Sequence, residues 1–150
     1  MDSKDQYLIE CSKKGQLEII RNLFQTNNYT NDILNKALNS TAINGHLEIV
    51  EFLIEKGAIV FECNNIALRY AAENGYLEIV KILVENGEDI HIWNNYPLRH
   101  AAKNGHLHTV KLLIEKGANI NDRGGFALRL ARKNGHTEII QLLIENGAIC

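Results

Sequence analysis

The segment NGHLEIVEFLIEKGA, residues 44–58, recurs along the chain at a constant spacing of 30 residues. Its copies read NGYLEIVKILVENGE from residue 74, NGHLHTVKLLIEKGA from 104 and NGHTEIIQLLIENGA from 134, and a diverged copy, KGQLEIIRNLFQTNN, begins at 14. Self-similarity at a fixed period of this size indicates an array of stacked units. This repeat constrains the fold more than any other feature of the chain.

Each copy has the pattern of an amphipathic helix with signals for its start and its end. In the first full copy, Leu47, Val50 and Ile54 recur at helical spacing and give the segment an apolar face. An Asn-Gly pair precedes the segment, and Gly57 follows it at the position of a left-handed helix cap. We therefore expect one helix in each copy.

A second, shorter helix is predicted upstream in each unit. Leucines recur there at positions 8, 38, 68, 98 and 128, and in the third unit Ala71 and Ala72 follow the leucine. Two helices joined by an Asn-Gly turn form an antiparallel hairpin. Since one hairpin cannot bury both of its apolar faces, the hairpins must stack on one another.

The composition is that of an ordinary soluble domain, with 45% hydrophobic and 23% charged residues and a net charge of −2. Such a charge gives no general attraction to nucleic acid or to anionic membranes. The sequence has no transmembrane stretch and no signal-peptide core, which predicts a cytoplasmic or nuclear location. Cys11, Cys63 and Cys150 form no CxxC pair and support neither a disulfide framework nor a zinc site.

These motifs together resemble the ankyrin repeat family over nearly the whole chain. Leu68, Leu98 and Leu128 keep the leucine of its Thr-Pro-Leu-His motif, Pro97 keeps the proline, and alanine pairs and Gly-His pairs follow in phase. The resemblance implies an all-α ankyrin-repeat solenoid of five stacked helix-turn-helix units. It also implies a protein–protein interaction module.

The period of 30 residues is shorter than the usual ankyrin period of 33. The difference falls where the family has a projecting β-hairpin. We therefore predict shortened, strandless loops at Glu62–Ile66, Ile92–Tyr96 and Asp122–Phe126. This short-loop variant is similar to the ankyrin repeats of giant viruses that infect amoebae, which would place it in the host-cell cytoplasm.

The chain is expected to be a single ankyrin-repeat domain, residues 1–150. Residues 1–30 form an N-terminal cap, 31–60, 61–90 and 91–120 are regular repeats, and 121–150 is a C-terminal repeat. Asn27 stands at the position of Gly57, which predicts a left-handed backbone there. In the last repeat Arg132 and Thr137 suit a capping role, yet the second helix keeps the interior apolar pattern. This incomplete cap suggests weak end-to-end self-association.

Two sets of residues recur at one position per repeat. His46, His106 and His136 follow the turn glycines, and we expect them to form hydrogen bonds between units, since they are too far apart to share a metal ion. Arg69, Arg99 and Arg129 begin the inner helices, where we expect them to bind loop carbonyls or a neighbouring acid. The alternative is that these arginines bind an acidic peptide or a phosphate group.

Positions that vary between repeats are free for recognition, and the loop tips vary most. Trp93, the only tryptophan, lies at the central tip, where it either anchors a partner or folds over the neighbouring loop. The residues predicted to contact a partner on the loop tips and the concave inner-helix face are Glu62, Asn65, Tyr70, Ile92, Trp93, Asn95, His100, Lys103, Arg123 and Lys133.

No motif for catalysis, for a cofactor or for a metal is present, so the sequence predicts a non-enzymatic module with an unknown protein partner. One alternative is an adaptor that recruits a target to host machinery such as a ubiquitin ligase. Another is a structural array that self-associates through the fifth repeat. The sequence around Asn121 also resembles the ankyrin site modified by asparaginyl hydroxylases.

Overall fold

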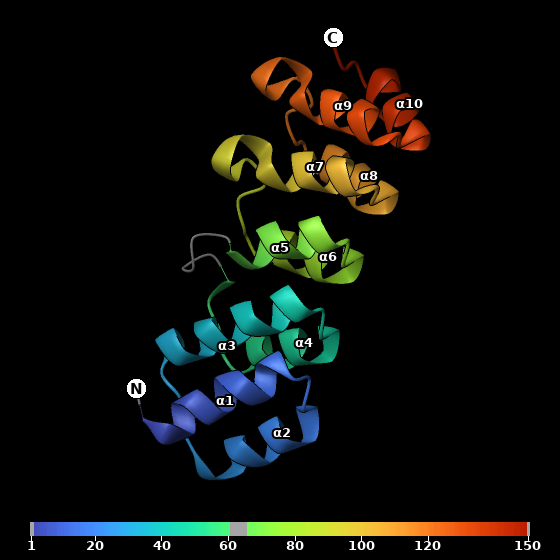
Figure 1. Ribbon diagram of the computed structural model, residues 1–150. Coiled ribbons are helices and arrows are strands. Elements are labelled where there is room, and N and C mark those ends of the chain that lie inside the picture. Colours follow the sequence, from blue (N-terminus) through green and yellow to red (C-terminus); the bar gives the residue numbers. More distant parts are fainter. Residues whose placement is uncertain (1, 61–65, 150) are drawn as a thin grey trace.

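The computed structural model describes residues 2–60 and 66–149, and these ranges form ten helices and no strand (Figure 1). The helices pair into hairpins that stack into a solenoid, which confirms the all-α ankyrin architecture expected from the sequence. The first helices of the hairpins are α1 (Ser3–Lys13), α3 (Asn31–Asn44), α5 (Ile66–Asn74), α7 (Ile92–Asn104) and α9 (Asp122–Asn134). The second helices are α2 (Leu17–Thr26), α4 (Leu47–Glu55), α6 (Leu77–Glu85), α8 (Leu107–Glu115) and α10 (Thr137–Glu145).

The two layers of helices pack unequally along the stack. Each first helix contacts its neighbouring first helices extensively, whereas the second helices contact one another much less. The first helices can approach closely because small residues such as Ala71, Ala101 and Ala131 are fully buried along them. The first helices therefore form the continuous inner layer, and the second helices form a more open outer layer.

The recurring leucines form the centre of the core. Each is buried almost completely, and full burial of a leucine side chain stabilises a fold by roughly 1.5 to 3 kcal/mol. Cys11 is buried among them, at the position that alanine occupies in the last three repeats. The core leucines of the first helices are Leu8, Leu38, Leu68, Leu98 and Leu128.

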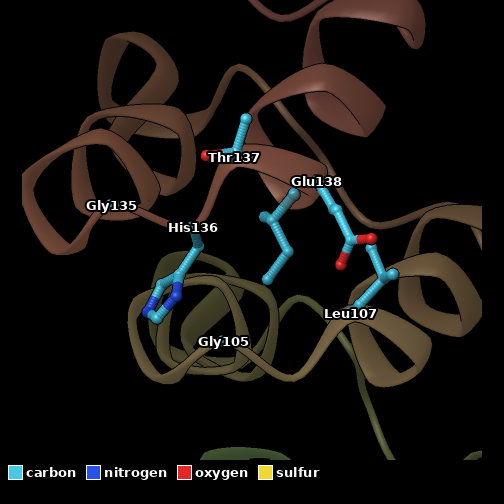
Figure 2. Close-up of a pocket in the computed structure, with 7 residues that line it drawn as sticks. Gly105, Leu107, Gly135, His136, Thr137 and Glu138 are labelled. Atoms are coloured by element: carbon cyan, nitrogen blue, oxygen red, sulfur yellow. The ribbon is translucent and has the colours of Figure 1, made fainter.

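The turn between the two helices of a hairpin depends on glycine for two reasons. Gly75 has a φ of +75°, which side chains rarely adopt, and a Cβ atom there would overlap the His106 ring of the next hairpin. In the last hairpin, His136 extends toward the turn at Gly105 in the same way (Figure 2). The glycine thus permits both the turn and the packing of the next hairpin against it.

The turn histidines hold successive hairpins together. Their Nε2 atoms donate to backbone carbonyls one hairpin earlier: His46 to Lys13 at 3.0 Å, and His136 to Lys103 at 2.8 Å. His106 donates to the Glu73 carbonyl at 2.9 Å. Because a carbonyl only accepts, these contacts fix the protonated nitrogen, and they confirm the prediction of hydrogen bonding between units.

The prediction of a left-handed backbone at Asn27 is wrong. Asn27 has φ −132° and ψ 147°, an extended conformation. Its side-chain Nδ2 donates to the Leu23 carbonyl at 3.0 Å, so the end of α2 is capped by the amide group rather than by a left-handed turn. Asparagine has a side-chain N–H donor that glycine lacks. Here the hydrogen bond from this donor caps α2, so a left-handed turn is not needed.

Candidate partner-binding surface

Left-handed turns stand where two of the shortened loops were predicted. Trp93, Asn94 and Asn95 have φ between 50° and 58°, and Arg123 with the two glycines after it repeats the conformation one hairpin later. In each case the three consecutive residues lie inside the bounds of the helix, α7 or α9, where they form a compact left-handed turn ahead of its right-handed part. No strand occurs at either turn, as predicted, while the loop at Glu62–Ile66 falls almost entirely outside the described residues.

The repeated arginines hold these turns in place. Arg99 Nε donates to the Asn94 carbonyl and Nη2 to the Trp93 carbonyl, both at 2.8 Å, and Arg129 Nη2 donates to the Arg123 carbonyl at 2.9 Å. Arg99 is only 9% exposed, and its burial, with the nearby Arg123 charge, lowers the pKa of the guanidinium from its ordinary value. The structure confirms that Arg99 and Arg129 bind loop carbonyls.

Aromatic rings separate successive arginines and form a column that the sequence interpretation missed. Tyr96 lies between Arg69 and Arg99, with guanidinium-to-ring distances of 4.6 and 5.8 Å. Phe126 lies between Arg99 and Arg129, at 5.5 and 5.1 Å. Such cation–π contacts each contribute on the order of 0.5 to 1 kcal/mol. The signal was present in the sequence, since each aromatic residue precedes its arginine by three positions.

Trp93 was predicted either to anchor a partner or to fold over the neighbouring loop, and its side chain has features of both arrangements. Its ring lies 3.9 Å from the Arg69 guanidinium of the preceding hairpin and meets the Tyr96 ring edge to face at 6.4 Å. The side chain nevertheless remains 55% exposed. The indole is therefore both supported by the neighbouring hairpin and open to solvent on its other side.

A hydrogen-bonded cluster lies next to this tryptophan on the inner helices α5 and α7. Glu73 accepts from the Tyr96 hydroxyl at 2.8 Å and from His100 Nδ1 at 3.3 Å, while the Tyr96 and His100 rings stack at 3.7 Å. Burial lowers the pKa of His100, and the Glu73 carboxylate offsets only part of this effect. Burial and the hydrogen bond to Glu73 raise the pKa of Tyr96. The cluster is thus a platform in which two stacked rings both donate to the Glu73 carboxylate.

Asn95 was predicted to contact a partner, but its position gives it a structural role. It is only 5% exposed, its Oδ1 accepts from the Asn119 backbone at 2.9 Å, and its Nδ2 donates to Asp122 at 3.2 Å. The equivalent Asn35 accepts from the Ile59 backbone in the same way. Because the amide joins the start of a repeat to its end, we remove Asn95 from the candidate surface.

The remaining predicted residues fall into three groups. Tyr70, Lys103, Arg123 and Lys133 are exposed, and Ile92 and His100 are half-buried. With the Asn94 amide oriented so that its oxygen faces Arg123, that oxygen accepts from Nη2 at 2.6 Å and from Nε at 3.2 Å. Arg123 therefore also braces the turn before it. Glu62 and Asn65 lie outside the described residues.

The last hairpin ends in partly uncovered apolar surface. Ile144 is 44% and Ile149 is 61% exposed, and no atom lies within 4 Å of a Cβ placed on Gly135, whereas a Cβ placed on each earlier turn glycine would contact the next hairpin.

Asn121, the candidate hydroxylation site, uses its amide to accept from Ile149 N at 2.8 Å and to donate to the Gly147 carbonyl at 3.0 Å. These contacts fasten the chain end to α9.

Glu88 is a buried carboxyl that the sequence interpretation did not single out. It is 4% exposed at a position where three other repeats have alanine, and the Leu68 N–H donates to its Oε2 at 3.1 Å. Its Oε1 has no hydrogen-bond partner among the described residues. Burial raises its pKa from 4.5 to about 8, against the opposing effect of the Leu68 N–H. Alignment of the repeats could have revealed Glu88, since it is the one acidic residue at a position where three other repeats have alanine.

The described residues contain no cluster of metal-ligating side chains, and no helix of this part is long and apolar enough to cross a membrane. The sequence matches the family model described as ankyrin repeats (3 copies) over residues 8–94 and 91–150. No curated protein matches the chain. Since the family model covers most of the sequence and the structure has the corresponding hairpin stack, the chain belongs to the ankyrin repeat family.

Proposed function

We propose that this protein is a non-enzymatic binding module that recognises a protein partner with the concave face of its inner helices and the adjoining loop tips. Ankyrin repeats are in general protein–protein interaction modules. The proposed partner-binding surface consists of Tyr70, Ile92, Trp93, His100, Lys103, Arg123 and Lys133.

The side chain of Trp93, which is exposed and yet packed against Arg69 and Tyr96, is the observation that carries this proposal. The backbone at Trp93 is held by Arg99, which binds the Trp93 carbonyl, and the ring rests on Arg69. A partner would therefore cause little loss of conformational entropy in the protein when it covers this indole. Aromatic residues and arginines of this kind dominate the energetics of protein interfaces.

The 30-residue period supports the further proposal that the chain is of the short-loop type seen in giant viruses of amoebae. In that setting the partner would be a protein of the host cytoplasm. An adaptor that brings such a partner to a ubiquitin ligase is the alternative form of the same function. Both forms require the same surface.

A display selection tests the proposal and does not require the natural partner to be identified. Peptides selected from a random library on the wild-type protein are compared for binding to Trp93→Ala combined with Arg123→Ala. A matched control is Tyr7→Ala, which removes an exposed aromatic side chain from the first hairpin. We expect the double variant to lose most of the selected binding and the control to keep it. Equal binding by all three proteins would contradict the proposal.

The apolar surface of the last hairpin supports a second candidate, self-association of copies through that end. Ile144 and Ile149 are the residues that a second copy would cover. Sedimentation velocity over a range of concentrations tests this candidate, with Ile144→Lys as the variant. A wild-type protein that stays monomeric at high micromolar concentration would contradict it.

A further inference from the structure

Charge is distributed very unevenly between the two helical layers. Helices α7 and α9 of the inner layer together carry six cationic residues and one carboxylate, a net charge of +5. The outer helices α4, α6, α8 and α10 carry eight glutamates and two lysines, a net charge of −6. The whole chain has a net charge of only −2, so its overall composition hides a basic inner face in the last two repeats.

Several of these inner cations are not neutralised within the protein. Lys103 and Lys133 are exposed, and no carboxylate of the described residues lies within 4.0 Å of their charged nitrogens. Arg129 is also exposed, and it donates a hydrogen bond to a backbone carbonyl rather than to an acid. By contrast, Lys36 and Lys14 elsewhere in the chain each pair with a carboxylate four residues earlier. The positive charges of Lys103, Lys133 and Arg129 are therefore available to a partner.

The structure assigns an acidic, extended peptide segment as the partner of this face, an inference that rests on the function proposed above. Lys103 and Lys133 occupy equivalent positions on neighbouring inner helices, about 10 Å apart as helices pack. In a peptide in the extended polyproline II conformation, which has three residues per turn, residues three positions apart lie on the same side and are separated by about 9 Å. Carboxylates at every third position would thus reach both lysines in turn.

The same face offers apolar contacts beside its charges. Tyr70 and Leu130 occupy equivalent positions, each directly after the arginine of its repeat, and Trp93 borders the face at the loop tips. An acidic segment with an aromatic or aliphatic residue would cover this apolar surface while its carboxylates meet the lysines. This combination of charge and apolar contact favours a peptide over a bare polyanion.

A nucleic acid is the rival ligand for a basic face. A nucleic acid carries one negative charge per nucleotide, more than a peptide with a carboxylate at every third residue, so the negative outer helices and overall charge of the protein oppose a nucleic acid more strongly. The Tyr96 ring of the platform is also not free to stack on a base, since it already stacks on His100. These observations favour the acidic peptide, and the experiment includes the rival as an outcome.

Fluorescence anisotropy with defined probes tests the inference. The probes are three labelled peptides of equal length with one Phe and with Glu, Gln or Lys at every third position, together with a single-stranded oligoribonucleotide. We expect the Glu peptide to bind about tenfold more tightly than the Gln peptide and to lose affinity as salt concentration rises. The Lys peptide should not bind detectably.

Two double variants localise the interaction. Lys103→Glu with Lys133→Glu reverses two charges on the inner helices, whereas Lys81→Glu with Lys111→Glu makes the same change in charge on the outer helices. We expect the inner pair to weaken binding of the Glu peptide at least about tenfold and the outer pair to change it less than about threefold. Circular dichroism verifies that both variants are folded.

Three outcomes would overturn the inference. They are equal binding of the Glu and Gln peptides, equal effects of the two double variants, and tighter binding of the oligoribonucleotide than of the Glu peptide. If peptides selected by display still depend on Trp93 in any of these cases, the proposed binding function stands and only the acidic character of the partner is wrong. If no Trp93-dependent peptide is found either, both proposals fail.

Discussion

Replacing Glu88 should stabilise this protein, and the gain should depend on pH. The side chain is 4% exposed, and one of its two oxygens has no hydrogen-bond partner among the described residues. Burial raises its pKa to about 8 in the folded protein, against an ordinary value of 4.5. A buried carboxyl whose pKa is raised takes up a proton on folding between these two values.

The sign and size of the effect follow from this pKa difference. Below pH 4.5 the carboxyl is protonated in both states and contributes no pH dependence. As pH rises through the window between 4.5 and about 8, the free energy of unfolding falls by about 1.4 kcal/mol per pH unit. Above about pH 8 the full penalty, on the order of 3 to 5 kcal/mol, is present.

Glu88→Gln is the informative variant, because it keeps the side-chain volume and an acceptor for the Leu68 N–H while removing the charge. We expect wild type and variant to have similar stabilities near pH 4.5, and the variant to be more stable by roughly 3 kcal/mol or more above pH 8. Glu88→Ala should gain less, since it leaves the Leu68 N–H unpaired at a cost of roughly 1 to 3 kcal/mol. Urea unfolding followed by circular dichroism at several pH values measures all three.

A reciprocal variant serves as the control. Ala118 occupies the position of Glu88 one repeat later and is 6% exposed, so Ala118→Glu should destabilise the protein increasingly as pH rises. A stability difference between wild type and Glu88→Gln that is the same at all pH values would refute the reasoning. It would mean that Glu88 stays ionised or stays solvated in the folded protein.

Two further predictions concern the turns. Gly75→Ala should destabilise the protein by roughly 2 to 4 kcal/mol, since it adds backbone strain and a contact with His106, whereas Gly57→Ala adds strain only and should cost about 1 kcal/mol. Thermal unfolding distinguishes the two, and equal losses would contradict the role of the ring contact. Arg99→Lys should loosen the turn at Trp93, because an ammonium group cannot reproduce the paired bonds to both carbonyls. The emission of this single tryptophan should then shift to longer wavelength, and an unchanged spectrum would contradict the bracing role.

Much of the fold was predictable because its determinants are local and are repeated. Helical spacing, the Asn-Gly turns and the left-handed glycines act within a few residues, and the constant period places each copy against the next. The histidine contacts were predictable for the same reason, since His106 recurs in phase with His46 and His136. The loop carbonyls were also the correct partners for Arg99 and Arg129.

Asn27 shows where local reasoning reached its limit. Asparagine tolerates a left-handed backbone, but it also brings an amide donor, and the structure uses that donor on Leu23. The choice between the two depends on the direction in which the chain must leave α2. That direction is set by the packing of α3, which lies beyond the local window.

The candidate surface depended on tertiary structure to a much greater degree. The recurrence of asparagine at positions 35, 65 and 95 indicated a packing role for Asn95 but did not identify Asn119 as its partner, and nothing in the local sequence placed Trp93 over Arg69. Both contacts join residues that are more than twenty positions apart, so only the stacking of hairpins brings them together.

The repeat pattern accordingly specified the helices, their turns and their stacking, because each of these depends on side chains within one unit and on the regularity of the period. The column of arginines and aromatic rings, the exposure of Trp93 and the burial of Glu88 were decided by the assembled solenoid. None of them follows from neighbouring residues alone: Tyr96 is sandwiched between arginines of two adjacent units, and Glu88 is buried with a hydrogen bond from Leu68, 20 positions earlier.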